Sequence, residues 1–267
     1  MSTIHFVDIA GAFLFGVVGL LVGSFLNVCI DRLPRERSVV SPPSHCEACG
    51  HRLGLWDLIP IVSYVVLRGR CRYCQAGISV KMLWVELATG LIFALLYWHY
   101  GLSPQFGIMA YYAASFIVVF VIDIEHELIL NKVVYPALIV ALLLSLVPQP
   151  WLTRWVVTTG IANAAMAGAI GFAIFLLIAV VSRGGMGWGD VKLVALIGLA
   201  TGFPLVLFTI VLAAIIGTIV AVALMIARRR RFRETLPFGP FLAVATMMTL
   251  VWGSDVLAWY MGLMAIP

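Results

Sequence analysis

Long apolar runs separated by short polar segments make up most of the chain. The first run, FVDIAGAFLFGVVGLLVGSFLNVCI (6–30), exceeds the roughly 20 residues that a helix needs to cross a hydrocarbon core of about 30 Å. It lacks a basic start and a small-residue cleavage site, so it predicts a retained helix rather than a signal peptide. The same pattern predicts eight helices in all. They span 6–30, 82–100, 104–123, 129–147, 156–182, 191–202, 204–227 and 239–262, of which the sixth is short for a full crossing.

Composition agrees with the apolar pattern. Of the 267 residues, 63% are hydrophobic and 11% charged, whereas soluble domains carry about 25% charged residues. No internal repeat or low-complexity segment interrupts the series of runs. The sequence therefore predicts an all-α polytopic membrane protein with about eight transmembrane helices and one sizeable polar loop, residues 31–81, between the first two.

The distribution of basic residues indicates an orientation. If the 31–81 loop is cytosolic, alternation places the loops 124–128, 183–190 and 228–238 on the same side. Sixteen of the 17 Lys and Arg residues then lie inside, and Arg154 is the exception. Both termini are therefore expected outside. The net charge of +5 reports this topology rather than a nucleic-acid partner, because no basic groove with interleaved aromatic residues is present.

Two carboxylates stand at the cytosolic ends of apolar helices under this topology. Asp123 ends the run FIVVFVIDIEHELIL, and Asp190 begins the run after GGMGWG. Two carboxyl groups held close together cannot both ionise easily, so one stays an acid while the other acts as a base toward water. That is the equipment of an aspartyl hydrolase. The alternatives are a helix cap for Asp190 and a boundary charge for Asp123. Glu125 and Glu127 compete with Asp123, and Glu127 shares its helical face.

Glycines frame the second carboxylate. Gly184, Gly185, Gly187 and Gly189 allow positive φ and a close approach of backbones, so a substrate strand could lie beside Asp190. Glycine also tolerates irregular backbone where it lines a cavity at membrane depth. We expect Gly185, Gly187, Gly189 and the nearby Lys192 to support the catalytic loop.

Two C-x-x-C pairs occupy the polar loop. CEAC contributes Cys46 and Cys49, and CRYC contributes Cys71 and Cys74. Four thiolates close a tetrahedral zinc site and leave no open position, so a structural Zn²⁺ is expected. A cytosolic location argues against stable disulfides, and no βαβ context favours redox chemistry. The fifth cysteine, Cys29, is expected to be a small buried apolar residue.

Taken together, these motifs resemble the bacterial prepilin peptidases, which are GxGD aspartyl proteases. The resemblance rests on GSFLNVCIDRLP (23–34), CEAC with CRYC, DIEHELILN (123–131), GMGWGDVKL (185–193) and PFGPFLA (237–243). It implies that Asp123 and Asp190 cleave the short basic leader of type IV prepilins or pseudopilins at the cytosolic face of the inner membrane. It also implies N-methylation of the new N-terminal residue with S-adenosylmethionine.

The motifs leave several local questions open. Family members often carry Pro shortly after the first catalytic Asp, where this chain has Leu130-Asn131, so the start of the next helix is uncertain. For S-adenosylmethionine we expect contacts from Asn27, Arg32 and Glu86. The alternative for Glu86 is an internal ion pair with Arg or Lys81. Gly23 and Ser24 could instead permit close helix packing. PFGPFLA could serve only to shape a turn and begin the last helix.

A division of labour follows from the order of these motifs. Residues 1–100 are expected to form an N-terminal methyltransferase part, 101–227 the aspartyl peptidase region, and 228–267 a basic loop with the final helix. Two other functions compete: an ion-coupled transporter that uses both Asp residues, and a structural subunit of an assembly platform. Transporters of this kind contain inverted repeats, which this sequence does not show. The expected partners are prepilin substrates and the lipid bilayer; the sequence indicates no oligomeric state.

Overall fold

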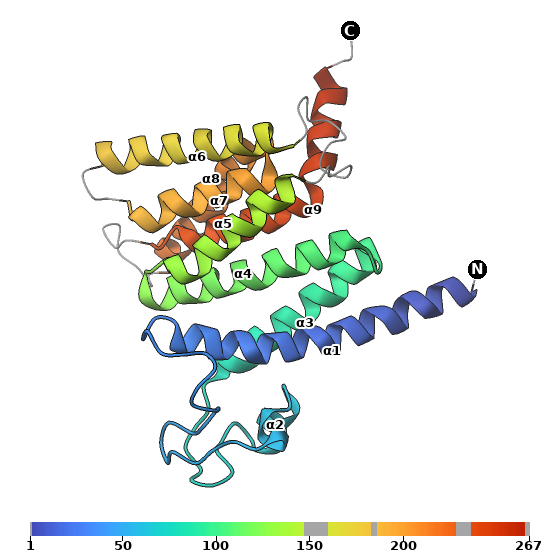
Figure 1. Ribbon diagram of the computed structural model, residues 1–267, viewed down its shortest axis with the longest axis vertical. Helices are drawn as coiled ribbons and strands as arrows, with labels where there is room; N and C mark the ends of the chain where they lie inside the picture. The colour runs from blue at the N-terminus through green and yellow to red at the C-terminus, as the bar shows by residue number, and fades with distance from the viewer. Residues whose placement is uncertain (1, 147–159, 183–185, 228–235, 265–267) are drawn as a thin grey trace. The chain divides into compact units, whose positions relative to one another are not determined.

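A computed structural model describes residues 2–146, 160–182, 186–227 and 236–264, and every long apolar run within them is helical (Figure 1). No strand occurs in these ranges. Two short helices in the polar loop, η1 (Leu55–Leu58) and α2 (Val62–Val66), were not expected from the pattern. The long helices are α1 (Ser2–Arg32), α3 (Val80–Tyr100), α4 (Pro104–His126), α5 (Asn131–Ser145), α6 (Ile161–Val181), α7 (Trp188–Thr201), α8 (Leu205–Ile226) and α9 (Gly239–Met264).

The all-α polytopic architecture is thereby confirmed. Among the described residues, six helices are long and apolar enough to cross a membrane, namely α1, α3, α4, α6, α8 and α9. The remaining two of the eight expected helices are shorter, with 15 residues in α5 and 14 in α7. At 1.5 Å per residue α7 spans only about 21 Å, which is less than the thickness of the hydrocarbon core.

The chain divides into two compact units, residues 1–118 and 119–267, with the division inside α4. In unit 1, α1 packs lengthwise against α3. Small residues make this approach possible: a Cβ atom on Gly19 would lie 2.7 Å from the Cβ of Phe93, and one on Gly23 would lie 2.8 Å from the Cα of Glu86. The close-packing role considered for Gly23 is therefore present.

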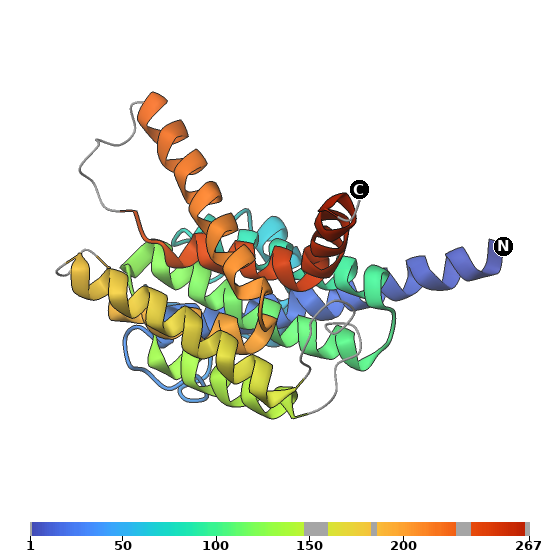
Figure 2. The same cartoon turned by 90° about the horizontal axis from the view of Figure 1, so that it is seen from above.

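In unit 2, α7 is the central helix and packs against α5, α6, α8 and α9 (Figure 1). No side chain from Val191 to Thr201 is exposed. Glycine again sets the spacing, because a Cβ on Gly198 of α7 would lie 2.5 Å from the carbonyl oxygen of Ala167 on α6. The second half of α8, in contrast, projects away from the unit (Figure 2), with Ile219 and Ile226 exposed. Such apolar surface suits contact with lipid.

One buried side chain fixes the turn between α7 and α8. Asn163 on α6 accepts a hydrogen bond from the N–H of Phe203 at 2.7 Å and donates to the carbonyl of the same residue at 3.2 Å. Gly202 before it has φ 72°, which a residue with a side chain rarely adopts. This clamp ends α7 and starts α8, so it secures the helix that carries Asp190.

Candidate active site and metal centre

Asp123 lies in the last turns of α4 and is the buried carboxylate of its segment, with 4% of its surface exposed. Glu125 and Glu127 are exposed. The helix ends at His126, and Glu127 adopts φ 52° while its N–H donates to the carbonyl of Asp123 at 3.0 Å. This left-handed residue is a common way to end a helix. Burial therefore separates Asp123 from the two glutamates that competed with it in the sequence.

The first residue of α9 meets the carboxylate of Asp123. The backbone N–H of Gly239 donates a hydrogen bond to this carboxylate, and a Cβ on Gly239 would lie 2.5 Å from its Oδ2. The N-terminus of a helix favours a negative charge. The motif PFGPFLA does begin the last helix, as one interpretation expected. Its contact with Asp123 was missed in the sequence, although a glycine at a helix start beside two prolines was a usable signal.

Asp190 lies in the first turn of α7, three residues after the N-cap Gly187. The N–H of Gly187 donates a hydrogen bond to the Asp190 carboxylate, which is the bond that the third residue of a helix makes in a capping box. Capping does not account for the whole group, however. Its Oδ1 is buried and has no hydrogen-bond partner among the described residues. Burial and, second, the charge of Asp123 raise the pKa of Asp190 to about 6.

Ile129 connects the two acidic ends. A Cβ on Gly189 would lie 2.7 Å from the Cβ of Ile129, and a Cβ on Gly239 would lie 3.1 Å from its Cδ1. The residue before Asp190 and the residue that binds Asp123 thus pack against one side chain. The structure therefore brings Asp123 and Asp190 to one place, close enough that the charge of one raises the proton affinity of the other.

The start of α5 is regular despite the missing proline. The helix begins at Asn131, with Leu130 as an extended N-cap. Asn131 Oδ1 accepts a hydrogen bond from Lys192 Nζ at 3.0 Å, and the same ammonium lies 5.6 Å from the centre of the Tyr135 ring. Lys192 thereby joins α5 to the first turns of α7, which holds Asp190 in position.

The glycine frame is only partly as expected. Gly187 has φ −72°, which any residue can adopt, so the positive φ that a glycine allows is not used there. Gly189 lies within α7, and because it has no side chain Ile129 can pack closely against its backbone. Gly184 and Gly185 lie outside the described residues.

The four cysteines of the polar loop converge. Their sulfur atoms all lie within 4.8 Å of one another, and those of Cys46 and Cys74 are 3.7 Å apart. Zn–S bonds of about 2.3 Å in a tetrahedron give S···S separations of about 3.8 Å. The donor set and its spacing therefore fit a metal ion. Cys29 is buried in α1, as expected.

Both cysteine pairs sit in turns of the same design. Gly50 N–H donates to the carbonyl of Cys46, and Gln75 N–H donates to that of Cys71, with positive φ at Gly50 and Gln75. The backbone N–H groups of Cys49 and Ala48 donate to the Cys46 sulfur and lower the pKa of this thiol to about 7. A thiolate is the form that a metal ion binds, so these two N–H groups favour the ligand form of Cys46, whereas burial and the neighbouring thiols raise the pKa of Cys74.

The three residues expected to contact the cofactor have protein partners in unit 1. Asn27 Nδ2 donates to the carbonyl of Met82 at 3.0 Å, whereas its Oδ1 is buried without a partner in the described part of the chain. Glu86 accepts the N–H of Ile61 at 2.8 Å. The Arg32 guanidinium donates to the carbonyls of Ser38 and Pro42. Of these three side chains, Asn27 is the one with a buried polar atom that lacks a partner within the described ranges.

Known proteins resemble the chain over most of its length. Residues 17–100 match the Bacterial Peptidase A24 N-terminal domain, and residues 110–222 match the Type IV leader peptidase family. The prepilin leader peptidase/N-methyltransferase of Stutzerimonas stutzeri is 31% identical over 92% of this chain and 92% of its own. The proteins of that name from Pseudomonas aeruginosa and Bacillus subtilis are 32% and 31% identical, over 92% and 91% of this chain and 91% and 95% of their own.

No solved structure matches the chain. The two family matches together cover both acidic helix ends and the four cysteines, and the relatives align over nearly their full lengths. The chain belongs to the type IV leader peptidase family.

Proposed function

We propose that the chain is an aspartyl endopeptidase that removes the leader from type IV prepilins or pseudopilins and then methylates the new N-terminus. The names of its relatives state both activities. The observation in this chain that supports the first activity best is the pair of carboxylates, Asp123 and Asp190, gathered at the ends of α4 and α7 around Ile129.

Hydrolysis needs one ionised and one protonated carboxyl group. We propose that the pair shares one proton. The ionised member takes a proton from water, whose oxygen attacks the scissile carbonyl, and the protonated member gives its proton to the leaving amine. The N–H of Gly239 positions Asp123 for this step, and the N–H of Gly187 positions Asp190. Lys192 and Gly189 support the loop, and Gly185 is proposed with them.

For methyl transfer we propose S-adenosylmethionine, which supplies an electrophilic methyl group to the new amine. Asn27, Arg32 and Glu86 remain the proposed contacts. The unfilled Oδ1 of Asn27 can accept from the ammonium group of the cofactor. Arg32 and Glu86 also bond to backbone groups, so in addition to the proposed contacts they would shape the loop around the site.

We propose that Cys46, Cys49, Cys71 and Cys74 bind one structural Zn²⁺, because four sulfur ligands leave no position for a substrate. Residues 1–100 would then form the methyltransferase part, 101–227 the peptidase, and 228–267 a basic loop with the last helix. The loop residues 228–235 lie outside the described structure.

The proposed location is the bacterial inner membrane, with both termini periplasmic and the carboxylates at the cytosolic face. The charge distribution of the sequence supports this orientation. A prepilin would present its cleavage site just outside its own hydrophobic helix, at the depth of the ends of α4 and α7.

Single Asp123→Asn and Asp190→Asn variants, co-expressed with a prepilin, test the peptidase. Each removes one proton carrier, so leader removal is expected to stop while the membrane level of the variant stays normal. Glu127→Gln is the matched control, since this exposed carboxylate lies one turn from Asp123, and it should cleave normally. Undiminished cleavage by both Asn variants would contradict the aspartyl peptidase proposal. It would leave the transporter and the platform subunit as alternatives, which none of the reported relatives supports.

A further inference from the structure

The polar loop of unit 1 contains an apolar surface of its own. Residues 55–66, LWDLIPIVSYVV, form η1, a turn and α2, and we call them the apolar segment. Leu55 and Trp56 are 86% and 77% exposed, and Val62, Val65 and Val66 are each more than half exposed. The three valines have the i, i+3, i+4 spacing of one helical face. Apolar side chains this exposed and this close in the chain favour a contact with a membrane or a protein.

A hydrogen bond fixes the depth of the apolar segment along α3. The N–H of Ile61 donates to Glu86 Oε2 at 2.8 Å. Glu86 follows Val80, the first residue of a membrane-spanning helix, by six positions, or about 9 Å of helix. The segment therefore lies alongside the first turns of α3 rather than beyond its end (Figure 1). Interfacial helices bury their apolar faces about 5–10 Å into the boundary of a bilayer, which is the same range.

The backbone at this contact is strained. Ile61 has φ 61° and ψ −50°, and a β-branched residue rarely adopts a positive φ. Such a conformation persists only where its surroundings hold it. The partner that holds Ile61 is a carboxylate that is itself 9% exposed, on a neighbouring helix. Glu86 thus fixes the direction in which the valine face of α2 points. The sequence did not suggest this role for an acidic residue in a membrane-spanning helix.

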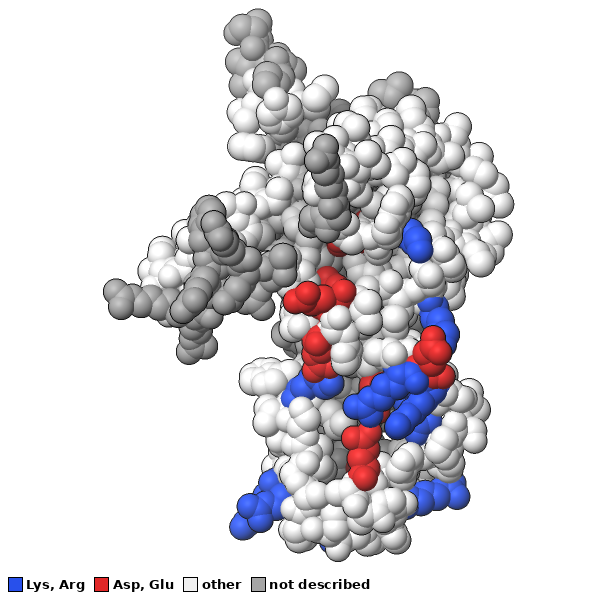
Figure 3. All heavy atoms as spheres, turned by 90° about the vertical axis from the view of Figure 1, so that its left-hand side faces the viewer, with Lys and Arg blue, Asp and Glu red and all other residues white. Residues whose placement is uncertain are grey.

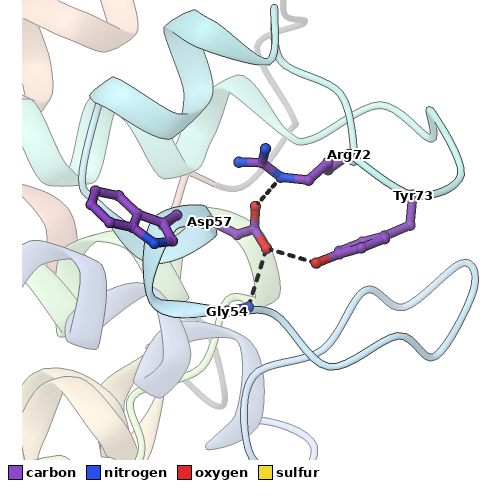
Figure 4. A pocket seen from close by; sticks show the side chains of 5 residues that line it. Gly54, Asp57, Arg72 and Tyr73 are labelled. Atoms are coloured by element: carbon purple, nitrogen blue, oxygen red, sulfur yellow. Dashed lines mark hydrogen bonds and ion pairs between the residues drawn. The ribbon is translucent and has the colours of Figure 1, made fainter.

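The other end of the apolar segment is attached to the metal centre. Asp57 on η1 accepts hydrogen bonds from Arg72 Nε at 2.7 Å, from the N–H of Gly54 at 3.1 Å and from the Tyr73 hydroxyl at 3.4 Å (Figure 4). Arg72 and Tyr73 are the two residues between Cys71 and Cys74. The one charge within the segment is therefore neutralised, and its side chain is 6% exposed.

Basic residues flank the segment on both sides in the sequence, and Asp57 is the one charged residue within it. Seven basic residues occur between positions 31 and 80, and Arg68 follows α2 by two residues. The basic and acidic side chains of this loop gather over the lower part of the view in Figure 3. An apolar segment that contains a tryptophan and is followed by an arginine suits a bilayer surface, where aromatic rings lie at headgroup level and arginine pairs with lipid phosphate.

We propose that residues 55–66 insert into the cytosolic leaflet, so that the loop is a membrane-bound platform rather than a free cytosolic domain. The four-cysteine cluster holds one end of this platform through Arg72 and Tyr73, and Glu86 sets its depth through Ile61. The partner is the lipid bilayer itself. The proposal depends on the membrane location of α3 and not on either proposed catalytic activity.

Brominated phospholipids test the insertion, because bromine quenches tryptophan only at close range. The full chain is reconstituted in liposomes whose lipids carry bromine either near the headgroup or deep in the chain. The difference in emission between the wild type and Trp56→Phe isolates Trp56 from the seven other tryptophans. We expect the shallow bromines to quench the emission of Trp56 more strongly than the deep bromines, and aqueous iodide to quench it little.

Two relocated probes in the Trp56→Phe background complete the test. Val66→Trp should behave as Trp56 does. Val40→Trp is the matched control, since Val40 is also exposed, at 85%, but lies outside the apolar segment and three residues after Arg37 in the sequence, and it should respond to iodide instead. Iodide quenching of both Trp56 and Val66→Trp would overturn the proposal. Protection from both iodide and bromine would also overturn it, because a protein partner would then cover the segment.

Discussion

A single methyl group on Gly239 should disable the proposed peptidase without unfolding the chain. In a Gly239→Ala variant the new Cβ would lie 2.5 Å from Asp123 Oδ2, whereas ordinary contacts begin at 3.4 Å. The carboxylate or the start of α9 must therefore move by about 0.9 Å, because packed interiors do not compress. The N–H that binds Asp123 is retained, so the change is one of position alone.

The size of the effect follows from that displacement. Misplacing a catalytic group by about 1 Å costs on the order of 10²-fold in rate, so we expect about a hundredfold loss of kcat for leader removal. Overpacking costs about 1–3 kcal/mol of stability, which a chain of this size should survive. The assay compares initial rates of prepilin cleavage by purified variants, with thermal melting in the same detergent as the check on folding.

Gly262 on the same helix supplies the control. A Cβ there meets no described atom within 4 Å, so Gly262→Ala should cleave at the wild-type rate. If Gly239→Ala also cleaves at that rate while it melts normally, the contact between α9 and Asp123 has no part in positioning the carboxylate.

Three further outcomes are expected. Asp190→Asn should be more stable than the wild type at pH 8, by at most about 3 kcal/mol, because a pKa of about 6 means that ionised Asp190 destabilises the fold. This gain in stability should shrink as the pH falls through 6 and vanish below about 4. A constant or reversed difference in denaturant titrations would contradict this expectation. Asn163→Ala should lose about 2–3 kcal/mol, since both backbone groups of Phe203 lose their partner; a loss under 1 kcal/mol would show that this clamp is dispensable. Cys71→Ser should abolish the one bound zinc per chain in elemental analysis, Cys29→Ser should retain it, and equal metal in both variants would place the metal elsewhere.

The sequence predicted what depends on local pattern. Each long apolar run became a helix, because the length of a run is a property of neighbouring residues. The two C-x-x-C pairs indicated their cluster because two such pairs in one polar loop supply four thiols. The pattern could not show that α7 lies within the protein. Leucine, isoleucine and valine suit lipid and protein neighbours equally, so composition does not separate the two environments.

Contacts between distant residues were beyond the pattern as well. Gly239 meets Asp123 across more than a hundred residues, and the sequence offered only a turn motif to indicate it. The bond between Glu86 and Ile61 depends on how the loop folds back along α3. The apolar character of 55–66 was visible in the sequence but overlooked, because it is shorter than a membrane span and lies in a segment with many charges.

The enclosure of α7 has a consequence for how the enzyme responds to its membrane. A helix in contact with lipid tilts or shifts when the bilayer becomes thicker or thinner, since its apolar length must match the hydrocarbon. From Val191 to Thr201, α7 exposes no side chain and meets four other helices instead. We therefore expect a change in acyl-chain length to shift Asp190 relative to those helices less than it would shift a residue on a lipid-facing helix.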